Sequence, residues 1–224
     1  VQLSHAAEDE SLTVPAQRLN LITTELQEGV MRTRMQPIGN VWNKFPRVVR
    51  DLAHSVGKQV QIEMDGADTE LDKTIVEAIK DPLTHLVRNA IDHGIETPAE
   101  RLAAGKREIG TLSITARQTG SEIRIGIVDD GKGIDGDKLM AKAIAANLIT
   151  AEDAKALTPR ERNMLICLPG LSTAKEVTAV SGRGVGMDVV RANIEKIGGS
   201  LVIDSTLGSG TRMMLNIPLT LSIV

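Results

Sequence analysis

Aromatic side chains are almost absent from this sequence, which has one tryptophan, one phenylalanine and no tyrosine in 224 residues. Aromatic rings usually supply much of the packing area of a protein core. We therefore expect a core of aliphatic and methionine side chains. The single cysteine, Cys167, excludes an internal disulfide and is typical of a protein from a reducing compartment.

The sequence also lacks a large charge excess and long apolar runs. Its formal net charge is -3 and no Lys/Arg run exceeds two adjacent residues, so we expect no nucleic-acid partner. No apolar stretch approaches the roughly 20 residues that span a bilayer, and no signal peptide is visible. The chain starts at Val1 without a methionine, and we expect it to be part of a longer protein.

Composition and apolar spacing divide the chain into four regions. Residues 1–14 are polar and acidic, and we expect a disordered tail there. Residues 15–36 are expected to form one helix, because a narrow apolar seam with helical spacing runs along it at Leu19, Ile22, Leu26 and Val30. Such a seam needs a partner to bury it. We assign residues 37–218 to one large domain and residues 219–224 to the start of another.

Within the large domain, residues that alternate between apolar and polar predict five strands. The expected strands cover residues 59–65, 111–117, 122–129, 200–205 and 211–219. The expected helices cover about 38–56, 71–93 with a break before Pro82, 135–168 and 187–197, and residues 169–186 are expected to be a mobile loop. Because the last two strands look antiparallel, we expect an α+β sandwich with helices on one face of a mixed sheet.

A polar stripe on the helix before residue 94 is the first candidate site. Spacing of four residues places His85, Asn89 and His93 on one helix face. A solvated helix face explains the stripe most simply. A site for a hard cation is the alternative, since an amide oxygen suits Mg²⁺ together with phosphate oxygens. Two histidines also suit zinc, but no third ligand has suitable spacing and Cys167 lies far along the chain.

The end of the third expected strand is the second candidate site. Period two places Asp129 on the apolar face of its strand, where a carboxylate needs a hydrogen-bond donor. An exocyclic amine such as that of adenine would be a suitable donor, and with so few aromatic residues the base would have aliphatic walls. Gly131 and Gly133 let the backbone turn and permit close approach. A simple strand-to-helix turn remains the alternative.

Two further glycine-rich segments are candidates. Gly182, Gly184 and Gly186 lead directly into a helix, an arrangement that exposes backbone N–H groups to phosphate but equally suits a hinge. They match neither the dinucleotide-binding fingerprint nor a Walker A sequence. Thr211 follows a Gly-Ser-Gly turn and alternates with apolar residues, so its hydroxyl is expected to point inward like Asp129, although the segment also suits a plain hairpin.

In this order, the motifs resemble the GHKL superfamily of ATP-binding domains, which includes histidine kinases, DNA gyrase, MutL-type repair proteins and a heat-shock chaperone. Within it, several stretches resemble the CheA-type chemotaxis histidine kinases. These are residues 31–38 (MRTRMQPI), 45–52 (FPRVVRDL), 68–72 (DTELD), 81–96 and 182–191. The resemblance covers nearly everything from residue 15 onward. It implies a GHKL (Bergerat-type) α/β sandwich preceded by the remnant of a dimerisation helix over residues 15–36.

The resemblance implies ATP and Mg²⁺ as ligands. Asn89 would coordinate the Mg²⁺ that bridges the phosphates, and His85 would lie near the γ-phosphate. Arg88, Asp92 and His93 would be polar neighbours of the triphosphate.

On the adenine side, the resemblance implies that Asp129 accepts from the amino group, assisted by Thr211. Gly131 and Gly133 would permit close approach. The remaining contacts would come from a lid, at Ser172, Thr173, Lys175, Gly182, Gly184 and Gly186.

The resemblance implies transfer of the γ-phosphoryl of ATP to a histidine on a separate phosphotransfer domain, which fits a site without its own nucleophile. Residues 219–224 would start a regulatory domain that couples the kinase to a receptor and an adaptor protein. A response regulator would act downstream. The full-length protein is expected to be a cytoplasmic homodimer recruited to receptor arrays.

One departure from the family pattern keeps a second reading open. The family usually has two phenylalanines around the lid, where this chain has Cys167 and Leu171. Losing both rings is expected to loosen the lid, so a catalytically weak ATP-binding scaffold is an alternative. An ATPase like the gyrase and repair branch is a third reading. That branch needs a glutamate where this chain has His85, which favours the kinase.

Overall fold

The computed structural model describes residues 10–171 and 186–219, which include a five-stranded mixed sheet of order β2-β4-β5-β7-β6. Strands β2 and β4 pair in parallel, and the other neighbours are antiparallel. The strands are β2 (Val60–Asp65), β4 (Gly110–Thr119), β5 (Glu122–Asp129), β6 (Ser200–Thr206) and β7 (Gly210–Pro218). Each lies within about two residues of its predicted position, because alternation between a buried and an exposed face is the strongest signal of a strand.

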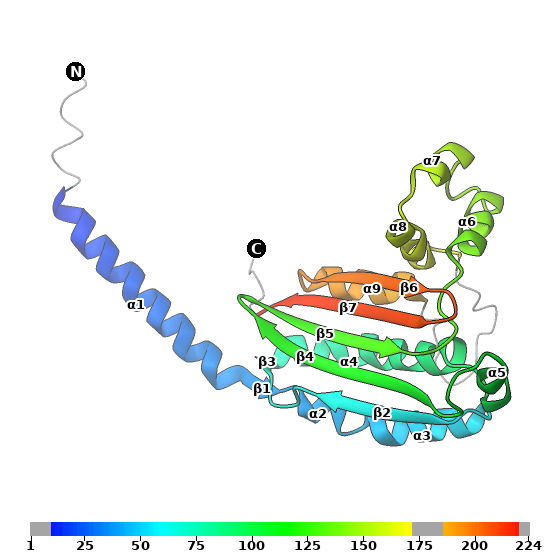
Figure 1. Ribbon diagram of the computed structural model, residues 1–224. Coiled ribbons are helices and arrows are strands. Elements are labelled where there is room, and N and C mark those ends of the chain that lie inside the picture. Colours follow the sequence, from blue (N-terminus) through cyan, green and yellow to red (C-terminus); the bar gives the residue numbers. More distant parts are fainter. Residues whose placement is uncertain (1–9, 172–185, 220–224) are drawn as a thin grey trace.

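The helices that pack on the sheet, α3, α4 and α9, cover one face of it, as predicted. Figure 1 shows α4 and α9 behind the strands and α6, α7 and α8 grouped at one end of the sheet, while α1 extends away from it. The helices are α1 (Glu10–Arg34), α2 (Gly39–Trp42), α3 (Phe45–Ser55), α4 (Lys73–Asn89), the π-helix η1 (Ala90–Gly94), α5 (Pro98–Ala103), α6 (Gly136–Ala145), α7 (Ala151–Ala156), α8 (Pro159–Met164), the 3-10 helix η2 (Leu165–Cys167) and α9 (Met187–Lys196). The α+β sandwich of the sequence prediction is confirmed.

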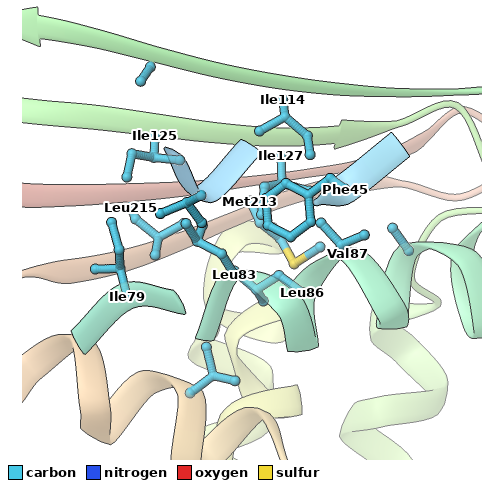
Figure 2. Close-up of a cluster of buried hydrophobic side chains, with 14 of the residues drawn as sticks. Phe45, Ile79, Leu83, Leu86, Val87, Ile114, Ile125, Ile127, Met213 and Leu215 are labelled. Carbon is cyan, nitrogen blue, oxygen red and sulfur yellow. The ribbon is translucent and has the colours of Figure 1, made fainter. Parts of the chain in front are cut away.

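The core lies between the inner face of the sheet and α4. Figure 2 shows aliphatic side chains of β4, β5 and β7 pointing toward α4, with Phe45 of α3 among them. The labelled members are all buried: Phe45, Ile79, Leu83, Leu86, Val87, Ile114, Ile125, Ile127, Met213 and Leu215. The expectation of an aliphatic core with few aromatic residues is therefore confirmed.

Helix α4 differs from the prediction at Pro82, which does not break it. The helix continues through Pro82 to Asn89 and then widens into η1. A proline removes one backbone donor and crowds the preceding turn. Here Pro82 is itself buried beside Leu83, so packing against the sheet outweighs the local loss. The prediction of a new helix at Pro82 was wrong, and the π-helical turn after Asn89 was not predicted.

The N-terminal helix also differs from its predicted bounds. It begins at Glu10, inside the expected tail, and ends at Arg34, because the next residues form β1 (Met35–Pro37), which pairs antiparallel with β3 (Glu70–Asp72). The Arg34 side chain binds both the Asp72 carboxylate, at 3.2 Å, and the Thr74 hydroxyl, at 2.6 Å. The remaining expected tail, residues 1–9, and residues 220–224 lie outside the described residues.

The seam of α1 lies open in this chain. Leu19, Ile22, Leu26 and Val30 are 66%, 54%, 67% and 53% exposed. An apolar row of this kind gains stability only when a partner covers it. Across the residues that the structure describes, no helix combines the length and the apolar content needed to cross a membrane.

The N-cap of α4 provides a test of how the fold is stabilised. Asp72 is buried, and its side chain accepts a 2.7 Å hydrogen bond from the Thr74 backbone N–H. We predict that Asp72→Ala lowers the free energy of unfolding by about 1–2 kcal/mol, measured by urea denaturation, because the first turn of α4 loses its cap and Arg34 loses its partner carboxylate.

Asp65→Ala is the matched control for this prediction. Asp65 pairs with Arg117 across an exposed surface, where an ion pair contributes less than about 1 kcal/mol. Asp72→Asn, which keeps an acceptor, should lose less stability than Asp72→Ala. Equal small losses for Asp72→Ala and Asp65→Ala would show that the cap does not stabilise α4.

Candidate functional site

A cavity of 340 Å³ lies where the C-terminal end of α4, the end of β5 and the start of α9 meet. It is of the size that ligand sites usually have. Its polar members come from α4, η1, β5, the turn after β5, and β7. The lining residues are His85, Asn89, Ala90, His93, Gly94, Asp129, Lys132, Gly133, Ile134, Leu139, Ile166, Leu171, Met187, Ile203, Thr211 and Met213.

The predicted polar stripe forms one wall of this cavity. His85, Asn89 and His93 all line it, and Leu86, on the adjacent stripe of the helix, is buried in the core. Burial, together with the nearby Arg88 and the His93 imidazole, lowers the pKa of His85. The His85 imidazole is therefore neutral at neutral pH and can accept a proton or a hydrogen bond.

Asn89 has a defined orientation at the junction of α4 and η1. Its side-chain Nδ2 donates to the Met187 sulfur at 3.2 Å, across to the first residue of α9. An amide has its donor and its acceptor on different atoms, so engaging the nitrogen leaves Oδ1 as the group for a ligand. A neutral amide oxygen is a suitable ligand for Mg²⁺. Among the described residues, no three His, Cys, Asp or Glu side chains come together as a metal site.

The turn of η1 is held from outside the cavity. Lys58 donates from Nζ to the backbone oxygens of Ile91, at 2.6 Å, and Asp92, at 2.8 Å. A π-helical turn leaves its carbonyls in unusual directions, and such turns are frequent at functional sites. Burial lowers the pKa of Lys58. Lys58 was not predicted, because its contact with η1 joins two segments that are separated in the sequence.

Asp129 is the buried carboxylate of the cavity, as its position on the apolar face of β5 predicted. It is 3% exposed, and its Oδ1 accepts a 2.9 Å hydrogen bond from the Gly131 backbone N–H. Burial raises the pKa of Asp129 from 3.8 to about 6, against the lowering effect of hydrogen bonds from the Gly131 and Thr211 backbones. The carboxylate is ionised at neutral pH and retains capacity to accept from a ligand.

Thr211 lies directly opposite Asp129 on the neighbouring strand β7. It is buried, and its hydroxyl is 3.0 Å from the hydroxyl of Ser205 on β6. The inward direction predicted for Thr211 is confirmed by this burial. The register between β5 and β7 therefore places a hydroxyl beside the buried carboxylate.

The two glycines after Asp129 are required by the protein's own backbone. A Cβ on Gly131 would lie 2.2 Å from the Gly94 oxygen, and a Cβ on Gly133 would lie 2.2 Å from the Thr206 oxygen. Gly133 also has a φ of +72°, which disfavours other residues. Both glycines allow the turn to pack closely, and only Gly133 of the two lines the cavity.

The other walls of the cavity are aliphatic, as the low aromatic content predicted. They are formed by Ile134, Leu139, Ile166, Leu171, Ile203 and Met213. Leu171 also packs with Ala143 and Leu165 in a second apolar cluster under α6. Cys167 is buried in the main core, and burial raises the pKa of its thiol to about 11. Both positions where the family usually has phenylalanine are thus filled by buried side chains.

The predicted site residues fall into three groups. Those that line the cavity are His85, Asn89, His93, Asp129, Gly133 and Thr211. Those described but outside its lining are Arg88, Asp92, Gly131 and Gly186. The predicted lid residues Ser172, Thr173, Lys175, Gly182 and Gly184 lie outside the described residues.

Several lining residues were missed by the sequence analysis. Lys132 lies between Gly131 and Gly133 and was assigned no role, and Gly94 directly follows the polar stripe. Met187 was noted only as part of a helix. No local pattern distinguishes a methionine that contacts a functional amide from one in the core.

The arrangement suits a ligand with a planar amine-bearing ring and an anionic tail. A buried carboxylate can accept from the amine, aliphatic walls can enclose the ring, and an amide oxygen can hold a cation bound to the anion. The side chains that supply these groups come from α4, β5 and β7, so only the folded chain assembles them.

Residues 78–221 match the family described as "Histidine kinase-, DNA gyrase B-, and HSP90-like ATPase". The sensor histidine kinase CheAY of Helicobacter pylori is 51% identical over 96% of this chain and 27% of its own length. The chemotaxis protein CheA of Klebsiella aerogenes is 50% identical over 89% of this chain and 30% of its own length. Among solved structures, the catalytic domain of histidine kinase ThkA covers 83% of this chain, with 16% identity and a TM-score of 0.48.

The chain spans less than a third of the length of these two curated relatives. The family match covers well over half of the chain, including most of α4, the end of β5 and β7. The chain therefore belongs to the family of histidine kinase-, DNA gyrase B- and HSP90-like ATPases, and within this family it corresponds to part of the CheA-type histidine kinases.

Proposed function

We propose that this chain binds Mg-ATP and supports transfer of its γ-phosphoryl group to a histidine on a separate phosphotransfer domain. The observation behind this proposal is that one cavity holds both an ionised buried carboxylate, Asp129, and an oriented amide, Asn89. These are the two groups that the resemblance assigns to adenine and to the metal. Similarity to CheA proteins over nearly the whole chain supports the chemotaxis setting.

Adenine would bind between the aliphatic walls, with its amino group donating to Asp129. Thr211, directly across the strand pair from Asp129, would assist. Guanine has a carbonyl oxygen where adenine has its amino group, so it would place an acceptor against the carboxylate. Unpaired acceptors in a buried site are costly, and the pocket would therefore favour adenine.

The triphosphate would lie beside Asn89, which would hold Mg²⁺ through Oδ1 while Met187 keeps the amide nitrogen engaged. The ion would neutralise negative charge on the phosphates. Helix α9 begins at Met187 after Gly186, with no side-chain cap, so its first N–H groups are available to phosphate. We infer that further residues complete the contacts with the triphosphate: Arg88, Asp92, His93 and the lid residues Ser172, Thr173, Lys175, Gly182 and Gly184.

In the transfer, an imidazole nitrogen of the acceptor histidine would attack the γ-phosphorus. The bond from the γ-phosphorus to the β–γ bridging oxygen breaks, and ADP leaves. His85 is neutral and lies one helical turn before Asn89, where it would orient the reacting groups through hydrogen bonds. This position favours a kinase over an ATPase, which needs a carboxylate to activate water.

The remaining partners are proposed on the same basis. The exposed seam of α1 would pair with the same helix of a second copy, which would make the full-length protein a homodimer. A regulatory domain would connect the kinase to a receptor and an adaptor protein, and a response regulator would receive the phosphoryl group later. The protein would work in the cytoplasm at receptor arrays.

Replacement of Asn89 tests the phosphotransfer proposal. We predict that Asn89→Ala lowers transfer from γ-labelled Mg-ATP to a purified CheA-type phosphotransfer domain by at least about 100-fold, because charge stabilisation at the phosphates is lost. The matched control is Asn40→Ala, an exposed position on α2 away from the cavity, which should keep the wild-type rate.

Transfer by the wild-type chain that persists unchanged in Asn89→Ala would contradict the role of Asn89. Normal ATP binding without any transfer by the wild type would instead favour the catalytically weak scaffold.

Replacement of Asp129 tests the adenine proposal and has a second readout in stability. We predict that Asp129→Asn weakens ATP binding by at least about tenfold, measured by calorimetry, because the charged acceptor is lost. The same change should raise the free energy of unfolding by up to about 3 kcal/mol above pH 6, because a carboxyl whose pKa rises from 3.8 to about 6 on folding opposes folding once it ionises.

The pH dependence of this gain has a definite sign. The folded state holds the Asp129 proton more tightly than the unfolded state, so wild-type stability relative to Asp129→Asn falls as pH rises from about 4 to about 6. Asp51→Asn, the same substitution at an exposed position of α3, is the matched control. A variant that is less stable than the wild type at every pH would contradict the burial argument.

A further inference from the structure

Four charged side chains gather behind the turn that follows Asp129. We call them the charge cluster: Glu96, Arg101, Lys106 and Asp130. Arg101 contacts Glu96 at 3.1 Å and the Asp130 carboxylate at 2.9 Å, and Lys106 contacts Glu96 at 2.7 Å. None of the four lines the cavity.

Local sequence brings the two cations to this place. Thr97 and Glu100 form a capping box at the start of α5, which sets the direction of this short helix. Arg101 lies on its inner side, and its Nε donates to the Arg107 backbone oxygen at 2.7 Å. The chain thus folds back after α5, and Lys106 joins Arg101 on the same side of the turn.

Three members of the charge cluster are unusually buried for charged residues. The Arg101 side chain is 1% exposed, Glu96 is 10% and Lys106 is 18% exposed, whereas Asp130 is 36% exposed. Two cations face two carboxylates, so the charges balance. Burying such groups costs desolvation energy that their attraction only partly offsets, and an apolar cluster is often as stable. Stability alone therefore does not account for the cluster, whereas its contacts with the backbone do.

Both cations bind the backbone of the turn. The backbone oxygen of Asp130 accepts from Arg101 Nη1 at 3.2 Å and from Lys106 Nζ at 3.0 Å. The backbone oxygen of Gly131 accepts from Lys106 Nζ at 2.7 Å. The Asp130 side chain is fixed as well, because its Oδ1 accepts from the Thr111 N–H at 2.8 Å.

One peptide group connects the charge cluster to the cavity. The oxygen of the Asp130–Gly131 peptide accepts from the two cations, and the N–H of the same peptide donates to Asp129 Oδ1 at 2.9 Å. Positive charge at the oxygen polarises a peptide and strengthens the hydrogen bond that its N–H donates. The cations thus act on Asp129 through this peptide without contacting the cavity.

The turn is also confined on its other side. A Cβ on Gly131 would lie 2.2 Å from the Gly94 oxygen, and the Lys132 N–H donates to that oxygen at 2.9 Å. The peptide therefore lies between η1 and the charge cluster, and it can move only if one of these contacts breaks.

We propose that Lys106 and Arg101 are positioning residues that set adenine selectivity, by holding the Asp130–Gly131 peptide so that Asp129 presents an oriented acceptor. This inference rests on the proposed binding of ATP. It goes further by assigning base selectivity to residues that do not touch the base.

Lys106→Met tests the proposal, since methionine keeps much of the side-chain volume and removes the charge. The probes are ATP and purine riboside triphosphate, which lacks the amino group, and their dissociation constants are measured by calorimetry with Mg²⁺. The wild type should bind ATP more tightly than it binds purine riboside triphosphate. In Lys106→Met the ATP affinity should fall about tenfold while the affinity for the analogue stays unchanged, because only ATP uses the Asp129 acceptor.

The controls separate positioning from general damage. Lys155→Met on the exposed face of α7 should leave both affinities unchanged. Lys106→Gln keeps N–H donors without the charge, so its preference for ATP over the analogue should lie between those of the wild type and Lys106→Met. It replaces Lys106→Met if thermal unfolding shows that the methionine variant does not fold.

Two results would overturn the inference, and they differ from failure of the proposed function. A folded Lys106 variant that binds both nucleotides less tightly by the same factor would show a structural role only. A folded variant that binds both nucleotides with wild-type affinity would show no role. A wild type that binds neither nucleotide would overturn the proposed function and this inference together.

Discussion

Packing of α4 against the inner face of the sheet is the contact on which the rest of the structure depends. Leu83 and Leu86 meet the aliphatic residues of β5 and β7, and this apolar contact fixes the rotation of the helix about its axis. Once the rotation is fixed, His85 and Asn89 must face the end of β5, because they lie on an adjacent stripe of the same helix. The candidate site is therefore a consequence of core packing.

The same packing creates a conflict at Asp129, and the protein retains it. A carboxylate on the inner face of β5 has its pKa raised by burial, which works against stability at neutral pH. The structure limits this cost with the backbone N–H of Gly131, whose peptide is held by Arg101 and Lys106. A site that destabilises the fold and is supported by several elements is typical of a binding function. The proposed contact with adenine explains why a buried carboxylate is retained at Asp129.

Two features of the chain depend on contacts between residues that are far apart in the sequence, and both differ from the prediction. Pro82 continues a helix because its ring is buried, although local chemistry favours a break. The strand pair β1–β3 forms because residues 35–37 pair with residues 70–72. Each segment is too short for its alternation pattern to predict a strand. Leu171 and Cys167 fill buried positions with smaller side chains, so packing at these two positions does not require aromatic rings.

The sequence by itself determined the five strands, the aliphatic core and the inward direction of Asp129 and Thr211. These follow from periodicity and composition, which act over a few neighbouring residues. It also placed His85, Asn89 and His93 on one helical stripe. Only the tertiary structure decided that this stripe meets Asp129 in one cavity, that Met187 engages Asn89, and that Lys106 holds the turn after β5. Such contacts join distant segments, and their energies depend on burial that no local pattern specifies.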